Sequence, residues 1–329
     1  MKKITIKDVA MEAGTSISAV SHILNESGDK KYSEKTIMLV KNAAKKLNYV
    51  PNNIARGMRT QLSHSIGIVN FWDMSNHIFV KNLKGIVETA NKYKYSVVIC
   101  PVSNDDVDDY SYIEYYTNKR IDGIIFLAPV ASERVINEEE HIKRMKEADV
   151  PFVVINTSLN SNLPNFFKYD FFNATYTATQ YLAERKYTDI TYVSRNMQEA
   201  YPEISERLNG YKQAVKELNI KEKTVSIEAV DKEVMRGFQA VVTSKSEVAK
   251  QIMDKAIDFG FKIPDDFSVI AANFENYSEF LHVPLTCAHI PILRIAEEAT
   301  CVLMNIINKQ TYRETTDFKC EIFEGKTVK

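Results

Sequence analysis

The sequence predicts an α/β protein in which a small all-α head precedes a larger body built from parallel β-sheets. Residues 1–60 show apolar residues at helical spacing and contain 11 Lys and Arg against five Asp and Glu, a net charge of +6. Since the whole chain carries −1, residues 61–329 carry −7. These later residues alternate short apolar runs with amphipathic stretches, which is the pattern of βαβ units. A basic head on an acidic body indicates nucleic-acid binding by the head alone.

The first helix of the head is expected to begin after Thr5. Thr5 is placed to cap it, and Asp8 is placed to reach back to the exposed N–H groups, as in a capping box. Gly14 marks a sharp turn, because a positive φ costs glycine little. A second helix is expected to begin near Ser16, and its apolar candidates are Ile17, Val20, Ile23 and Leu24. Two helices joined by such a turn have the spacing of a helix-turn-helix.

The polar residues of the second helix are suited to reading DNA. They are short groups that match base edges and phosphates: Ser16, Ser18, Ser21 and His22. A third helix is expected after a cap at Ser33, with inward Ile37, Val40, Ala44 and Leu47 and outward Lys35, Lys41, Lys45 and Lys46. A generic three-helix module with solvated serines has the same pattern, but the basic charge of the head favours DNA binding.

A short helix is also expected within residues 52–59. Asn52 can cap it, but at about one and a half turns it is too short to be stable alone in water. Arg56 and Arg59 suit phosphates or a narrow minor groove, and Met58 is an apolar wedge of the kind that unstacks a base step. We expect this segment to order on DNA beside a partner chain. An ordinary basic linker is the alternative.

The 269 residues of the body are too many for one compact core and suit two α/β lobes. The expected strands are the apolar runs at 66–69, 96–100, 123–127, 152–155, 190–193, 240–243 and 267–271. The clearest helical stretches are 79–93, 110–119, 174–185, 205–218 and 292–307. Continuous apolar runs between amphipathic helices predict parallel sheets that are covered on both faces.

A set of fixed spacings resembles those of one known family. The runs are TIKDVA at 5–10, AGTSISAVS at 13–21, LN at 24–25, LNYVPN at 47–52, IARGMR at 54–59 and SIGIV at 65–69. Together they resemble the lactose repressor (LacI/GalR) family of bacterial transcriptional regulators, over residues 4 to about 325. The resemblance implies a homodimer that binds a palindromic operator in double-stranded DNA. Most such proteins are repressors of carbohydrate or related catabolic genes.

The resemblance also implies DNA-binding roles. It implies base reading by Ser16, Ile17, Ser18 and His22, backbone or register contacts by Ser21, Asn25 and Tyr49, and a minor-groove wedge at Met58; the implied set also includes Thr5, Asn52, Ala55 and Arg59. Many relatives have Arg at the position of His22, so operator recognition is expected to differ there. Most relatives have Leu where Met58 stands, which is a modest change in the same role.

The implied domain organisation has three parts. A helix-turn-helix domain spans 1–48, a hinge helix and linker span 49–62, and an effector-binding and dimerisation domain spans 63–329. The last part resembles a two-lobed periplasmic binding protein. Its first lobe covers about 63–157 and 292–318, and its second covers about 158–291 and 319–329. The chain therefore passes from one lobe to the other three times. An effector cleft is expected between the lobes, beyond the carboxyl ends of the parallel strands.

Six residues are implied to contact the effector: Trp72, Phe79, Asn156, Arg207, Lys245 and Asn273. Trp72, the only tryptophan, stands where relatives often have Pro beside the pocket, as a ligand platform or a plug. Phe79 fits a ring-stacking role and a core aromatic equally well. Arg207 begins the run RLNGY, which matches a family motif whose Arg reaches sugar hydroxyls or a carboxylate.

The expected cleft departs from the family in its polar residues. Lys245 stands where relatives have Asn, and Asn273 stands where they have Asp, so acceptors for neutral sugars are lost. Two explanations remain open. The ligand is anionic, such as a sugar phosphate or an organic acid rather than a sugar, and binds Lys245 and Arg207. Alternatively, the pocket is vestigial and Lys245 pairs with Glu203 or Glu247.

The sequence displays no catalytic chemistry. It contains no G-x-S-x-G, Walker or G-x-G-x-x-G motif, and its histidines and four cysteines lack metal-ligand spacing, so we expect no enzyme activity, cofactor or metal. The cysteines are expected to be free thiols. No signal peptide and no apolar run of about 18 residues is present, so we expect a cytoplasmic protein without a membrane span.

Three functions are therefore weighed for the chain. The first is a regulator controlled by a ligand in the cleft. The second is a regulator controlled by a protein partner, with a vestigial small-molecule pocket. The third is a cytoplasmic solute-binding module without DNA activity, against which residues 1–60 argue strongly.

Overall fold

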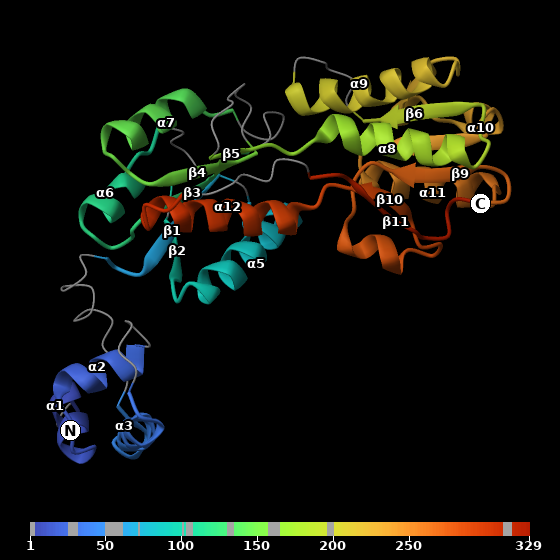
Figure 1. The fold of residues 1–329 in the computed structure, drawn as a ribbon. Helices are drawn as coiled ribbons and strands as arrows, with labels where there is room; N and C mark the ends of the chain where they lie inside the picture. Colours follow the sequence, from blue (N-terminus) through green and yellow to red (C-terminus); the bar gives the residue numbers. More distant parts are fainter. Residues whose placement is uncertain are drawn as a thin grey trace. The chain divides into compact units, whose positions relative to one another are not determined.

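The computed structural model describes residues 4–25, 32–49, 62–71, 73–100, 102, 108–129, 135–156, 165–195, 201–311 and 318–329. The chain divides into two compact units, residues 1–63 and residues 64–329 (Figure 1). They correspond to the expected head and body, and each is described by itself.

Residues 4–25 and 32–49 of the head form three short helices: α1 (Ile6–Glu12), α2 (Ile17–Asn25) and α3 (Glu34–Lys46). The expected helix starts are confirmed. The Asp8 carboxylate accepts hydrogen bonds of 2.7 Å from both the N–H and the hydroxyl of Thr5. Ser33 Oγ accepts from the N–H of Thr36 at 3.2 Å, and Gly14 in the turn has φ +62°. The local signals in the sequence therefore produce the predicted helix-turn-helix.

The core of the head has one correction to the prediction. Val9, Val20 and Val40 are fully buried, one from each helix. Ile17 was one of the apolar candidates of this helix and also an expected base-reading residue, and it is 44% exposed instead of part of the core. It is the first residue of α2, and the buried face of that helix begins at Ala19.

The first lobe of the body contains a five-stranded sheet in the order β2-β1-β3-β4-β5, with every pairing parallel. Its strands are β1 (Ser65–Asn70), β2 (Ser96–Cys100), β3 (Ile124–Leu127), β4 (Phe152–Ile155) and β5 (Phe166–Phe167). Helices α5 (His77–Lys92) and α12 (Ile292–Ile307) cover one face, and α6 (Tyr112–Thr117) and α7 (Glu138–Glu147) cover the other (Figure 1). β2 is less buried than predicted, because it is an edge strand whose Ile99 is 38% exposed.

The second lobe contains a six-stranded sheet in the order β11-β10-β9-β8-β6-β7, and only the β10–β11 pair is antiparallel. Its strands are β6 (Ile190–Ser194), β7 (Thr224–Ser226), β8 (Ala240–Thr243), β9 (Ser268–Ala271), β10 (Thr286–His289) and β11 (Glu321–Phe323). One face carries α8 (Phe171–Glu184) and α9 (Pro202–Glu217), and the other carries α10 (Lys232–Arg236) and α11 (Ser246–Phe259). Short 3-10 helices span Ile227–Ala229 (η1) and Asn276–Phe280 (η2).

The chain crosses between the lobes three times, as expected. It passes from β5 to α8, from β10 to α12 and from α12 to β11. The first crossing lies between Phe167 and Phe171 instead of at 157/158. The reason is that Phe166 and Phe167 pair in parallel with Val154 and Ile155 and so extend the first sheet.

Three helices begin earlier than the predicted stretches. α5 begins at His77 instead of residue 79, because Asn76 Oδ1 accepts from the N–H of Ile78 at 2.8 Å. α8 begins at Phe171 instead of residue 174, because Asp170 caps it through the N–H of Asn173 at 2.7 Å. α9 begins at residue 202 instead of 205, with Pro at its first position.

Within the described residues, no helix is long and apolar enough to cross a membrane. No group of three or more His, Cys, Asp or Glu in the same part of the chain could hold a metal ion. The four cysteines are free thiols, and Cys100 and Cys287 are buried.

Candidate DNA-binding face and interlobe cavity

The N-terminal turn of α2 presents three consecutive side chains to solvent. Ser16, Ile17 and Ser18 are all exposed. Ser16 Oγ also accepts a hydrogen bond of 3.1 Å from the N–H of Ala19, so it caps the helix. In helix-turn-helix proteins the N-terminal residues of the second helix contact base edges. The structure therefore leaves this expected base-reading set accessible.

His22 and Tyr49 are less exposed than the serines. The His22 ring lies 6.4 Å from the Tyr32 ring in an edge-to-face arrangement, and its Nδ1 is buried without a hydrogen-bond partner among the described residues. Tyr49 packs against the core of the head, and burial raises the pKa of its hydroxyl. This position is compatible with the register-holding role expected for Tyr49.

Several expected site residues lie outside the described part of the chain. They are Asn52, Ala55, Met58, Arg59 and Trp72, together with the side chain of Asn25. Their roles stay predictions.

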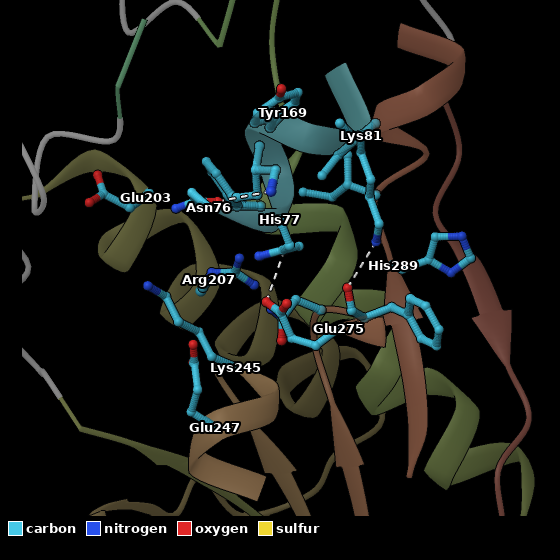
Figure 2. Close-up of a pocket in the computed structure, with 16 residues that line it drawn as sticks. Asn76, His77, Lys81, Tyr169, Glu203, Arg207, Lys245, Glu247, Glu275 and His289 are labelled. Atoms are coloured by element: carbon cyan, nitrogen blue, oxygen red, sulfur yellow. Dashed lines mark hydrogen bonds and ion pairs between the residues drawn. The ribbon is translucent and has the colours of Figure 1, made fainter. Parts of the chain in front are cut away.

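A cavity of about 100 Å³ lies between the two lobes of the body (Figure 2). The first lobe lines it with the start of α5, and the second lobe lines it with the starts of α9 and α11 and with residues 273–275. Four charged residues also line an adjoining compartment of about 540 Å³ near the ends of β6 and β8: Glu203, Arg207, Lys245 and Glu247. Together the two spaces have room for a small ligand.

Arg207 is buried in this cavity, with 6% exposure. Its guanidinium donates to the carbonyl of Ala272 at 2.7 Å and lies 4.7 Å from the centre of the Phe171 ring. Burial lowers the pKa of Arg207, which reflects the cost of removing a cation from water. The expected position of Arg207 at the cleft is thus observed, with part of its guanidinium already bonded.

Asn273 also lines the cavity, but its amide is occupied within the protein. Asn273 Oδ1 accepts from the N–H and the hydroxyl of Ser246, the first residue of α11. Its Nδ2 donates to Glu275 Oε1 at 3.1 Å. Asn273 therefore fastens the segment after β9 to the start of α11.

Positive and negative side chains are balanced around the cavity. Lys81, Arg207 and Lys245 face the same space as the three carboxylates of Glu203, Glu247 and Glu275 (Figure 2). The two expected cations, Arg207 and Lys245, are present on the wall formed by the second lobe. Glu203 and Glu247 were expected only as alternative partners of Lys245, and Glu275 was not part of the predicted site.

Two contacts join the lobes directly at this cavity (Figure 2). His77 Nε2, from the first turn of α5, lies 2.9 Å from Glu275 Oε1. Lys81 Nζ, one turn later, donates to the carbonyl of Phe274 at 3.1 Å and lies 4.9 Å from the centre of its ring. Burial lowers the pKa of Lys81, and the charge of Glu275 opposes that shift.

Two of the expected effector residues do not line the cavity. Phe79 is 3% exposed and lies in the core between α5, α12 and the first sheet. Of its two expected roles, it therefore has that of a core aromatic. Asn156 ends β4 with φ +65°, and its Nδ2 donates to the carbonyl of Ala128 at 3.0 Å. Asn156 therefore ties together the ends of β4 and β3.

The sequence did carry a signal for two residues that were missed. His77 stands two residues before Phe79, which was an expected effector residue. Glu275 stands two residues after Asn273, another expected effector residue. Both interlobe partners are therefore polar neighbours of residues that were already expected at the cleft.

Family models match nearly the whole chain. Residues 5–52 match the model described as bacterial regulatory proteins, lacI family. Residues 63–246 match periplasmic binding proteins and sugar binding domain of LacI family, and residues 179–328 match a periplasmic binding protein-like domain. The head and body thus match the two parts of one known architecture.

Characterised relatives cover similar lengths. The chain is 28% identical to the HTH-type transcriptional repressor PurR of Vibrio atlanticus (strain LGP32), over 99% of this chain and 98% of that protein. It is 26% identical to catabolite control protein A of Priestia megaterium, over 94% of each. The fold matches a Lac repressor structure with TM-score 0.70 and 19% identity, over 99% of this chain and 100% of that one. The chain belongs to the LacI family of bacterial regulatory proteins and is a DNA-binding transcriptional regulator, not an enzyme.

Proposed function

We propose that this protein is a cytoplasmic repressor of carbohydrate or related catabolic genes that binds a palindromic operator as a homodimer. The observation that carries the proposal is the exposed N-terminal turn of α2, with Ser16, Ile17 and Ser18 accessible on a basic head. In the dimer, each α2 reads one half-site in the major groove. Residues 52–59 then enter the minor groove between the half-sites, with Met58 as the wedge.

The test is selection of DNA from a random pool by the full-length protein. We expect an enriched sequence with two-fold symmetry and with half-sites about one helical turn apart. The substitution Ser18→Ala should weaken binding to that sequence. Recovery of an asymmetric site, or no enrichment above the starting pool, would contradict the proposal.

Dimerisation is supported by exposed apolar side chains on the second lobe. Phe280 is 82% exposed and Ile257 is 61% exposed. Ile257 borders a groove of about 530 Å³ that is also lined by Met253, Phe261, Leu281 and Val283. Apolar side chains clustered around a groove are typical of protein interfaces. We propose that a second copy of the chain covers this surface.

Sedimentation of the Phe280→Asp variant tests the proposed interface. We expect a shift from dimer towards monomer, because a carboxylate would be buried without a partner. Val135→Asp is the control, since Val135 is 70% exposed but lies in the first lobe. A dimer that survives Phe280→Asp with unchanged affinity would place the interface elsewhere.

We further propose that a small ligand in the interlobe cavity controls DNA binding. The cavity presents Arg207 and Lys245 to an anionic group and Glu203 and Glu247 to hydroxyl groups. A sugar phosphate carries both kinds of group, and its phosphate oxygens accept charge-assisted hydrogen bonds from guanidinium and ammonium groups. Among structures with this fold, CelR is in complex with cellobiose and an Escherichia coli regulator is in complex with phosphate.

A titration with hexose phosphates, neutral sugars and organic acids tests the ligand class. Melting temperature and the fluorescence of Trp72, the only tryptophan, report binding. We expect the largest response with a sugar phosphate. Arg207→Lys should reduce this response, because Lys cannot form the two-pronged contact of a guanidinium. A flat response to all three classes would remove the proposal.

Control by a protein partner is the second candidate. It is favoured by the small volume of the interlobe cavity and by the hydrogen bonds that already occupy Asn273 and part of Arg207. The relative of Priestia megaterium is named catabolite control protein A, but that name specifies no partner. Affinity capture from cell extract, run beside the ligand titration, separates the two candidates.

A further inference from the structure

The carboxylate of Glu275 bridges the two lobes of the body. Its side chain is 7% exposed and comes from the segment that follows β9 in the second lobe. Oε1 lies 2.9 Å from His77 Nε2 of the first lobe and 3.1 Å from Asn273 Nδ2 of its own lobe. The carboxylate thus accepts from donors on both sides of the cleft, as the anionic group of a ligand bound between the lobes would have to do.

The segment that carries Glu275 is held firmly in the second lobe. Asn273 Oδ1 accepts from Ser246 at the start of α11. The hydroxyl of Ser278 donates to Ser246 Oγ at 3.3 Å and accepts from the N–H of Glu275 at 3.4 Å. Glu275 therefore presents its carboxylate from a fixed backbone, not from a free loop.

The first lobe meets this segment with two side chains that donate to acceptors. His77 and Lys81 lie one turn apart on α5 and so face the same way. Lys81 binds the carbonyl of Phe274, directly before Glu275, and stacks on the Phe274 ring. Without the Glu275 carboxylate, the His77 and Asn273 donors would face the cavity beside the Lys81 ammonium with no anion between them.

We propose that Glu275 is a tethered anionic ligand that holds the cavity closed and competes with the anionic group of the effector. This inference rests on the proposed control by a cavity ligand and concerns how that site is regulated. Glu275 holds the lobes together through its contact with His77 across the cavity. A carboxylate or phosphate that enters must displace it from His77 and overcome its repulsion, since like charges placed together repel.

The test measures binding of inorganic phosphate to the full-length protein at constant pH and ionic strength. Glu275→Gln keeps the shape of the side chain but removes its charge. We expect this variant to bind phosphate about tenfold or more tightly than the unmodified protein, because repulsion is removed while His77 and Lys81 remain. The matched control is Glu279→Gln, an exposed Glu in the same segment with the same charge change. It should bind phosphate like the unmodified protein.

A second variant separates a specific site from a general charge effect. His77→Ala combined with Glu275→Gln should lose the gained phosphate affinity, because alanine has no side-chain donor. Equal phosphate affinities for Glu275→Gln and Glu279→Gln would overturn the proposal, as would a double variant that keeps the full gain. Neither measurement involves DNA, so failure to select an operator would count against the proposed function alone.

The radius of gyration of the phosphate-free protein gives an independent readout by small-angle scattering. His77→Ala removes the partner of Glu275 from the first lobe at a partly exposed position, so folding is expected to be retained. We expect a larger radius for His77→Ala than for Glu279→Gln, because the link between the lobes is lost. An unchanged radius would show that Glu275 does not hold the lobes together.

Discussion

Ile17 is an apolar residue that is exposed to solvent. Its exposure suggests a role in contacting a partner and not in folding. A solvated isoleucine at the first position of α2 contributes little to folding, because the buried face starts at Ala19. A thymine methyl in the major groove is an apolar partner that a helix N-terminus can reach. The neighbouring hydroxyls of Ser16 and Ser18 are suited to hydrogen bonds with base edges.

Ile17→Ala is therefore expected to weaken operator binding without destabilising the head. We expect a loss of roughly fivefold in affinity, about 1 kcal/mol, from the missing apolar contact. The free energy of unfolding should change by less than about 0.5 kcal/mol, as for other exposed positions. Met38→Ala on α3 is the control, because Met38 is 63% exposed in the same unit. Equal losses of affinity in both variants would contradict a base-reading role for Ile17.

His289 connects burial at the cavity to the pH dependence of stability. Burial lowers the pKa of this imidazole, and the nearby Glu321 opposes the shift. Its Nδ1 is buried without a hydrogen-bond partner among the described residues. Below the unfolded value of about 6.5, the unfolded chain therefore binds a proton at His289 more readily than the folded chain does. Stability from this group is present above that pH and is lost as the pH falls towards the folded pKa.

We expect His289→Gln to reduce the loss of stability on acidification. Urea unfolding of both proteins at pH 7.5 and at mildly acidic pH measures this difference. Since the other titrating groups are common to both proteins, their contributions cancel in the comparison. An equal or larger loss of stability in His289→Gln would show that burial does not lower the pKa of His289.

Elements with strong periodicity were predictable from the sequence, whereas their first turns were not. The continuous apolar runs of β1, β3, β4, β8 and β9 lie within their sheets as expected. The two-residue β5 and the more polar β7, β10 and β11 lack such a signal. Three helices begin before the predicted stretches, and four cavity residues lie in these missed first turns: His77, Ile78, Phe171 and Glu203. Capping residues and polar first turns set the starts of these helices, where the cavity residues lie. The apolar periodicity of the sequence gives no information about these positions.

The packing of α8 on α9 depends on one glycine in the motif that contains Arg207. A Cβ on Gly210 would lie 2.1 Å from the carbonyl oxygen of Phe172 and 3.1 Å from the backbone N of Tyr176. These backbone atoms cannot yield as the end of a flexible side chain can. Glycine thus allows the two helices to approach closely, and this approach helps to set the position of Arg207 one turn before it.

Gly210→Ala is expected to destabilise the body by about 3 kcal/mol or more, since overpacking against backbone forces the helices apart. Urea unfolding of the full-length protein measures the loss. Gly237→Ala is the matched control, because the nearest atom to its Cβ would lie at 3.4 Å and its φ is not positive. The control should change stability by less than about 1 kcal/mol. Similar effects at both positions would show that the α8–α9 contact adapts easily.

The charge of the whole molecule is divided between its two units. The head has a net charge of +6 and the remainder −7, although the chain as a whole is close to neutral. Phosphate contacts release counterions, so affinity for DNA depends on salt with a slope that counts those contacts. Because the body is acidic, it adds no attraction to DNA. The salt dependence should therefore be set by the lysines and arginines of the head.

We expect operator affinity to fall by about 10³-fold or more between about 50 and 200 mM salt, if the dimer makes at least six phosphate contacts. Lys41→Gln combined with Lys45→Gln, two exposed positions on α3, should reduce the slope of log affinity against log salt by about 0.9 for each contact removed. Lys232→Gln combined with Lys262→Gln makes the same change of charge at exposed positions of the body and should leave the slope unaltered. Fluorescence anisotropy of labelled operator measures all three proteins. An equal decrease of the slope in the double variant of the body and in that of the head would contradict this expectation. Binding would then be governed by the total charge of the protein and not by contacts of the head.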